Sequence, residues 1–153
     1  FLLPEDLDGK FTGVSRFWGI DANALKAELD VSYRYGTKLE ASAKVGYHRW
    51  KTADGGETIS YNRPQWEGGV NIRYMPVRPF TLEAGYEFAA GREYSNLGKL
   101  SDIHLVHLKA SYAFTSWFSL YGLTDNVLNR KYDILYGMPA QGINFMFGVD
   151  LKF

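Results

Sequence analysis

The chain has 153 residues, enough for one domain of ordinary size, and its 17 Lys and Arg balance 17 Asp and Glu. This balance argues against a nucleic-acid partner, which normally requires a basic excess. The absence of cysteine excludes a disulfide framework and a thiolate zinc site. Aromatic residues make up 16% of the chain and glycine occurs 16 times, a composition that favours strands separated by turns.

Apolar and polar residues alternate along most of the chain, which is the pattern of β-strands with two different faces. Near the start, Leu25, Leu29 and Val31 fall on one face, while Glu28 and Asp30 fall on the other. In chain order, the predicted strands cover residues 22–35, 39–48, 65–74, 80–88, 104–114, 118–126 and 143–153, and only 118–126 lacks clear faces. Residues 1–21 are predicted to be an extracellular loop or an outward extension of the first strand, and residues 10–20 within them could form an eighth strand.

The predicted connections alternate between short turns and long loops. The short turns are residues 35–38, 75–79 and 114–117, and the long loops, rich in Gly, Asn, Asp and Pro, are 50–64, 89–101 and 128–141. Aromatic residues gather beside the short turns and again toward the long loops, with small and aliphatic residues between them. Two aromatic girdles around an apolar band are typical of outer-membrane barrels. The predicted fold class is therefore all-β, a transmembrane antiparallel β-barrel.

A soluble β-sandwich is the alternative, because its strands also alternate. Each apolar face has five or six positions, which suits strands of about 9–11 residues that cross a bilayer. Strands of soluble proteins more often have about five or six residues in all. The polar faces mix carboxylates with Arg and Lys, as expected of a wide polar interior. The residues predicted to face this lumen are Glu28, Asp30, Arg34, Glu83, Glu87 and Lys109.

The C-terminal segment TDNVLNRKYDILYGMPAQGINFMFGVDLKF resembles the end of TonB-dependent outer-membrane receptors. That family typically has an Asn-Leu-Phe-Asn/Asp-Lys-Lys-Tyr-like segment, matched here by residues 125–132, and then a loop with Pro and Gly, matched by Pro139 and Gly142. Its last strand ends in an aromatic residue, as this chain does at Phe153. Upstream, WGIDANALKAELDVSYRY is similar to a long strand of the family, with Ala27 where Gly is usual.

The resemblance covers about residues 15–153 and implies a receptor that imports a scarce nutrient, such as a siderophore, cobalamin, a glycan or a peptide. It implies a location in the outer membrane of a Gram-negative bacterium, with outer-membrane lipid around the barrel. It also implies three protein partners: the plug and other strands of the same receptor, the TonB complex, which contacts an N-terminal part, and the barrel-assembly machinery. Phe153 is placed to be the terminal aromatic residue that this machinery reads.

Strand parity predicts that the chain is part of a larger barrel. If Phe153 is periplasmic, the last strand runs inward, and so does the first of the seven, so the chain before it starts outside. Bacterial single-chain barrels have even strand numbers. The large charged side chains of the polar faces also suit a barrel of roughly 22 strands better than one of about eight. A small stand-alone barrel with a structural or adhesive role is the alternative.

The long loops hold the candidate ligand contacts, because loops on a rigid wall commonly carry binding residues. These candidates are Arg49, Trp50, Tyr61, Arg63, Arg92, Tyr94, Tyr136 and Gln141. No cofactor or metal is expected, because His104 and His107 fall on opposite faces of a strand and His48 has no identifiable partner. No enzyme is expected either, since a cluster of Ser101, Asp102 and His104 is the only candidate for rim catalysis.

Overall fold

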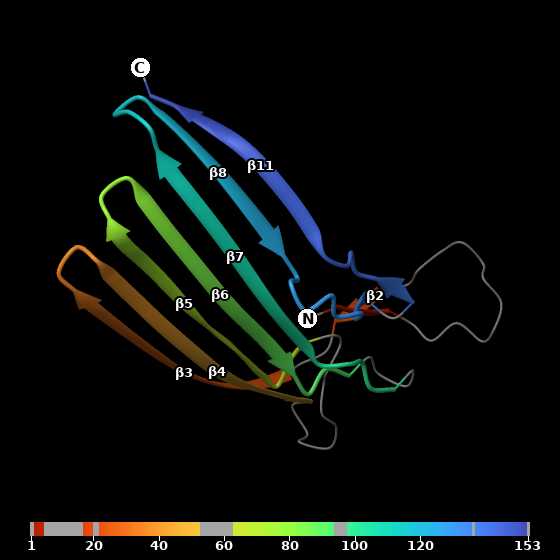
Figure 1. Ribbon diagram of the computed structural model, residues 1–153. Helices are drawn as coiled ribbons and strands as arrows, with labels where there is room; N and C mark the ends of the chain where they lie inside the picture. Colours follow the sequence, from red (N-terminus) through yellow and green to blue (C-terminus); the bar gives the residue numbers. More distant parts are fainter. Residues whose placement is uncertain are drawn as a thin grey trace.

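The computed structural model describes residues 2–4, 17–19, 22–52, 63–93, 98–135 and 137–152. Seven strands form the main sheet, in the spatial order β11-β8-β7-β6-β5-β4-β3 (Figure 1). They are β3 (Ala22–Tyr35), β4 (Leu39–Thr52), β5 (Trp66–Val77), β6 (Phe80–Ala90), β7 (Ile103–Ala113), β8 (Phe118–Asp125) and β11 (Asn144–Leu151). All the neighbours in this sheet are antiparallel, so the all-β prediction is confirmed.

Two small antiparallel pairs lie outside the main sheet. β1 (Leu2–Pro4) pairs with β2 (Phe17–Gly19), and β9 (Asp133–Leu135) pairs with β10 (Met138–Pro139). β2 lies within residues 10–20, the possible eighth strand, and it pairs with β1 rather than with the main sheet. In the described part of the chain, no helix is long and apolar enough to cross a membrane.

The short turns lie together at one end of the sheet, and the described residues that flank the long connections lie at the other (Figure 1). The turn between β3 and β4 depends on Gly36, whose φ of 54° is a left-handed conformation that glycine adopts without steric cost. The backbone N–H of Lys152 donates to the carbonyl of Trp117 over 2.9 Å, so the end of β11 lies beside the β7–β8 turn. The end of β11 is therefore at the short-turn end of the sheet.

The pairing register sorts the side chains onto two faces, because directly paired residues point to the same side of a sheet. On one of the two faces, a row of paired residues crosses five neighbouring strands: Val31, Ala43, Val70, Tyr86 and Val106. We call this side the apolar face and the opposite side the polar face. The predicted alternation therefore persists from strand to strand, which requires every hairpin to keep its register.

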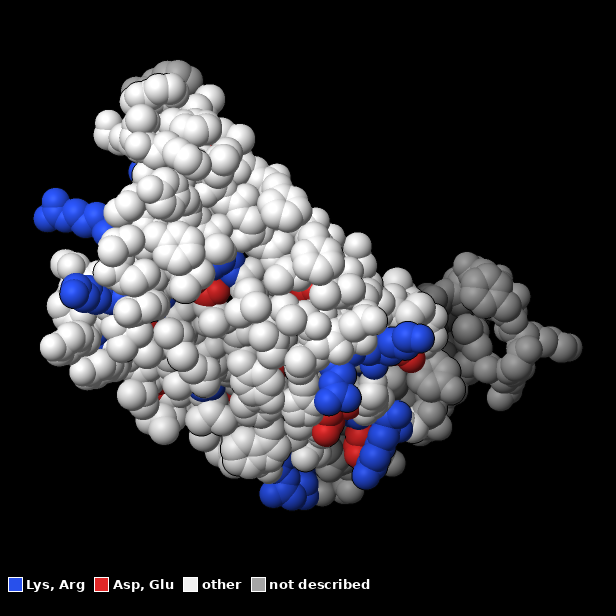
Figure 2. Space-filling view, in the orientation of Figure 1, with Lys and Arg blue, Asp and Glu red and all other residues white. Residues whose placement is uncertain are grey.

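The apolar face does not pack against any described part of the protein. Leu29 and Phe145 are each 61% exposed, and Phe147 is 83% exposed. Within the described residues, Leu100 is the only buried hydrophobic side chain, at 8% exposed. The face shown in Figure 2 carries charged side chains near both ends and almost none in the broad area between them. Such a band suits contact with hydrocarbon, whereas a β-sandwich would bury its apolar face against a second sheet.

We expect the two faces to respond oppositely to a new charge. Val70→Arg should lower the free energy of unfolding in lipid vesicles by about 2–4 kcal/mol, because it places a charge in the hydrocarbon. Asn71→Arg, one residue along and on the polar face, should change it by less than about 1 kcal/mol. Denaturant unfolding of the complete natural polypeptide in lipid measures both values. Equal losses in the two variants would contradict the assignment of the faces.

Candidate functional site

A row of alternating charges crosses the polar face from β3 to β7. The register places Arg34, Glu40, Arg73, Glu83 and Lys109 side by side on five neighbouring strands. Arg34 Nε lies 3.0 Å from Glu40 Oε1, and Arg73 Nε lies 3.5 Å from Glu83 Oε1. These side chains are 39–73% exposed, so each pair stabilises the sheet by only about 0–1 kcal/mol. The row is best described as a solvated wall with both signs of charge.

This wall borders a groove on the polar face with a volume of about 810 Å³. Arg34, Glu83 and Lys109, three of the residues predicted to face the lumen, line it. Asp30 faces the same way because it pairs with Lys44, and Glu87 does so because it pairs with Gly69 in the same row. Glu28 lies two residues before Asp30 on β3, so it shares this face as well.

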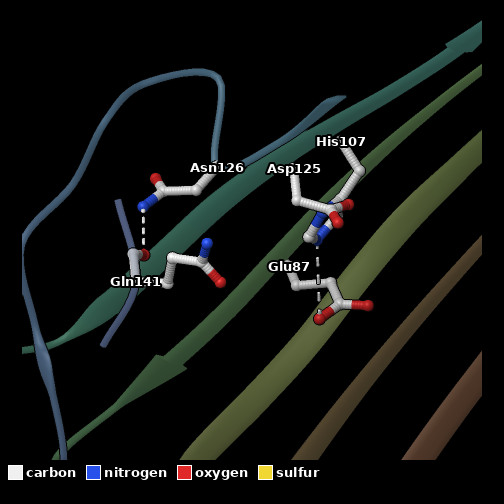
Figure 3. Close-up of polar contacts among 5 residues, drawn as sticks. All are labelled: Glu87, His107, Asp125, Asn126 and Gln141. Atoms are coloured by element: carbon white, nitrogen blue, oxygen red, sulfur yellow. Dashed lines mark hydrogen bonds and ion pairs between the residues drawn. The ribbon is translucent and has the colours of Figure 1, made fainter. Parts of the chain in front are cut away.

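His107 connects three strands on the polar face. Its Nδ1 lies 3.1 Å from Asp125 Oδ1 on β8, and its Nε2 lies 3.8 Å from Glu87 Oε2 on β6 (Figure 3). The Nε2 atom is buried and has no hydrogen-bond partner among the described residues. The two carboxylates stand on opposite edges of the imidazole ring, so they cannot converge with it on one ion. They can instead hold the ring in a fixed orientation across β6, β7 and β8.

A second histidine lies among acidic residues nearer the long connections. His48 Nε2 on β4 is 3.1 Å from Glu67 Oε1 on β5, and its side chain is only 12% exposed. Glu28 on β3 approaches the same point, and one potential ligand atom from each of the three residues lies within 4.8 Å of the others. Lys26 Nζ lies 2.7 Å from Glu28 Oε1. Histidine and carboxylate side chains are common metal ligands, so this cluster has the donor set of a cation site.

Arg92 is the main polar anchor of the long connections. Its guanidinium donates to the carbonyl of Ser101 over 3.1 Å and to the carbonyls of Asp133 and Ile134 over 2.8 and 2.9 Å. The residue is 3% exposed, and this burial lowers the pKa of the guanidinium from its ordinary value. The ordinary value is so high that Arg92 stays charged at neutral pH. It therefore ties the β6–β7 connection to the segment around β9.

Asn126 holds the last long connection in the same manner. Its side-chain amide donates to the carbonyl of Gln141 at 3.3 Å (Figure 3). The same amide donates to the carbonyl of Arg130 at 2.9 Å, and the side-chain oxygen accepts from the backbone N–H of Arg130 at 2.8 Å. Asn126 has a φ of 50°, a conformation that Asn tolerates better than most residues. The residue belongs to the segment that carries the family resemblance, and its observed task is to shape the connection between β8 and β11.

The predicted ligand contacts fall into three groups. Arg49 and Trp50 lie in β4 rather than in a loop, because that strand runs four residues further than predicted. They point to opposite faces: Arg49 pairs with Leu25 on the apolar face, whereas Trp50 is on the polar side, where the guanidinium carbon of Arg63 lies 4.5 Å from its ring centre. Arg92 and the Gln141 carbonyl take part in the anchors described above. The remaining predicted contacts, Tyr61, Tyr94 and Tyr136, lie outside the described residues, as does Phe153, the predicted terminal aromatic residue for barrel assembly.

Sequence reasoning missed the partners of His48 and His107. Both partner sets come from neighbouring strands that are 18–20 residues away in the sequence. A correct pairing register would have placed Glu28, Glu67 and Asp125 beside these imidazoles, but the register depends on how each loop closes. The clusters could therefore have been found only after the hairpins had been aligned.

No protein-family model and no curated protein matches this sequence. Solved structures do match its fold. The copper transporter OprC aligns with a TM-score of 0.79 and 17% identity, over 100% of this chain and 27% of that one. The outer-membrane ferripyoverdine receptor of Pseudomonas aeruginosa aligns with a TM-score of 0.73 and 19% identity, over 95% of this chain and 22% of that one. The FpvAI receptor in complex with pyocin S2 gives a TM-score of 0.75.

These neighbours are TonB-dependent outer-membrane receptors, so the fold that the terminal segment implied is confirmed. Identities of 17–19% show a common fold and do not by themselves transfer an activity. The chain spans about a quarter of the length of the receptors it matches. It therefore has the fold of one part of such a barrel, consistent with the open edges at β3 and β11 in the described sheet.

We expect Arg92→Ala to loosen the β9–β10 region without unfolding the main sheet. The variant removes donors to three carbonyl groups and should cost about 2 kcal/mol or more locally. Arg92→Lys should not restore the wild type, because a lysine lacks the planar fork that reaches several acceptors. Limited proteolysis between residues 128 and 142 measures the effect, with Arg49→Ala as the control arginine. Cleavage no faster than in the wild type would contradict the anchoring role.

Proposed function

We propose that this chain forms C-terminal strands of the barrel of a TonB-dependent transporter in the outer membrane of a Gram-negative bacterium. The observation that carries the proposal is the division of a seven-stranded antiparallel sheet into an uncovered apolar face and a charged polar face. A receptor wall needs this division, because lipid contacts one side and a water-filled or plugged lumen contacts the other. The fold shared with two nutrient receptors supports it.

In this proposal, each part of the chain has a separate task. The apolar face contacts outer-membrane lipid, and the solvated charges from Arg34 to Lys109 line the lumen around the plug. The long connections, held by Arg92 and Asn126, contribute to the outer binding surface, with Trp50 and Arg63 as the best-placed ligand contacts. Phe153 serves as the terminal signal for the barrel-assembly machinery. The TonB complex acts on another part of the same receptor and drives passage of the ligand.

The transported molecule is proposed only as a class: a siderophore, cobalamin, a glycan or a peptide. The neighbours transport or bind copper and ferripyoverdine, so the same wall fold serves ligands of very different size. A ligand of this class would meet the polar face and the long connections, where aromatic and cationic side chains lie together. Arg63 over the ring of Trp50 is one such pair.

Deletion of the natural gene tests the proposal. We expect the deletion strain to lose uptake of one labelled compound from a panel of ferric siderophores, cobalamin, oligosaccharides and peptides. A strain that lacks TonB should lose the same uptake, because energy reaches such receptors only through that complex. Fractionation should place the protein in the outer membrane. An outer-membrane protein whose deletion leaves all uptake unchanged would instead favour the small structural or adhesive barrel.

We further expect Trp50→Ala to weaken ligand binding about tenfold or more, because truncation of a buried contact aromatic commonly costs over 1 kcal/mol. Leu25→Ala is the matched control, since it lies at the same end of the sheet on the apolar face. Equilibrium binding of the transported compound to the detergent-purified receptor measures both variants. Equal ligand affinities of Trp50→Ala and the wild type would show that Trp50 does not contribute to ligand binding.

A further inference from the structure

Three residues from three neighbouring strands converge on one point of the polar face: Glu28 of β3, His48 of β4 and Glu67 of β5. His48 Nε2 and Glu67 Oε1 are 3.1 Å apart, and the nearest ligand atom of Glu28 lies within 4.8 Å of both. The cluster is separate from the charge row, whose β3 member, Arg34, lies six residues further along the strand. The three residues take no part in the ion pairs of the charge row or in the hydrogen bonds of Arg92 and Asn126 that are described above.

Gly46 makes the convergence possible. The register places it directly between Glu28 and Glu67, in the middle of the row formed by the three strands. A Cβ atom at this position would lie 3.0 Å from His48 Nε2, 3.6 Å from Glu67 Cγ and 3.7 Å from Glu28 Cγ. A larger side chain here would therefore fill the space that the three ligating groups share. Because Gly46 has no side chain, the imidazole and the two carboxylates can approach one another at this point.

The dimensions of the cluster suit a small divalent cation. A tetrahedral ion with bonds of about 2.0–2.2 Å holds its ligand atoms about 3.3 Å apart. The His48–Glu67 distance is already close to this value. The ligand atoms of the cluster are at most 4.8 Å apart, so the longest distance would have to shorten by about 1.5 Å. Rotation of the half-exposed Glu28 side chain can bring its carboxylate closer by this amount. No movement of the backbone is needed.

The donor set indicates the class of cation. One imidazole nitrogen with two carboxylates suits Zn²⁺, Fe²⁺ or Mn²⁺, whereas Ca²⁺ and Mg²⁺ prefer oxygen ligands alone. We infer that Glu28, His48 and Glu67 form a binding site for a divalent first-row transition cation, which joins β3, β4 and β5 on the polar face. The site does not depend on the proposed uptake function, since it uses only contacts within the sheet.

Lys26 is the internal competitor for this cation. Its Nζ lies 2.7 Å from Glu28 Oε1, so its ammonium already supplies a positive charge to one of the three ligands. An incoming divalent cation has to displace this contact and experiences repulsion from the same ammonium. Removal of the lysine charge should therefore strengthen cation binding. If the three residues only made structural hydrogen bonds, removal of the Lys26 charge would not strengthen cation binding. A Lys26 variant therefore distinguishes the two cases.

Calorimetric titration of Zn²⁺ into the complete natural polypeptide, purified in detergent without a histidine tag, tests the inference. We expect the wild type to bind one more Zn²⁺ than His48→Gln, or to bind it with a Kd at least about tenfold lower. Glu67→Gln should show the same loss. Lys26→Met should bind more tightly than the wild type. Zn²⁺ should also raise the unfolding temperature of the wild type and not that of His48→Gln.

The two other histidines of the chain are the matched controls. His104→Gln and His107→Gln should retain the Zn²⁺ stoichiometry and affinity of the wild type, although His107 also lies beside two carboxylates. A heat-dependent shift in gel mobility shows whether each variant is folded. If His48→Gln or Glu67→Gln does not fold, Glu28→Gln is measured in its place. Equal Zn²⁺ binding by the wild type and His48→Gln, or loss of the ion in a control variant, would overturn the site.

Discussion

Antiparallel backbone pairing is the constraint on which the rest of this structure depends, and its register is kept along each strand pair of the main sheet except for one shift between Tyr74 and Val77 near the β5–β6 turn. In a sheet, each residue faces the side opposite to its chain neighbours, so a slip of one position would exchange the two faces of a strand. From β3 to β11 the pairing keeps every apolar row on one side, and the glycine turn at Gly36 shows how tightly one hairpin closes. The same pairing satisfies the backbone N–H and C=O groups, which hydrocarbon could not do.

The polar face is organised by charge balance rather than by burial. Its ion pairs are exposed and individually weak, so they contribute little to the stability of the sheet. Their alternation of sign nevertheless lets large side chains stand side by side without net repulsion, which suits the wall of a wide lumen. Against this background, the less exposed histidines are the distinctive features. His107 is held between two strands by carboxylates, and His48 lies in one cluster with Glu28 and Glu67.

The long connections depend on a different interaction, the burial of polar side chains that bind backbone carbonyls. Arg92 and Asn126 are the two buried polar residues in the described part of the chain, and both join segments that are distant in the sequence. Connections that bury so little apolar surface need such anchors, because their backbone groups would otherwise depend on water alone. The segment that resembles the family's terminal motif thus contains a structural anchor.

The sequence by itself determined the strands, their two faces, the alternation of short and long connections and the type of barrel wall. These features follow from local patterns, since the period of two and the turn residues can be read without knowing which strands touch. The six residues predicted to face the lumen share the polar face for the same reason. The tertiary structure alone decided that Arg92 is buried, that Arg49 and Trp50 belong to a strand, and that Glu28, His48 and Glu67 meet. Each of these depends on the strand ends and on the register between residues about 20 positions apart, and loop closure rather than local pattern sets that register.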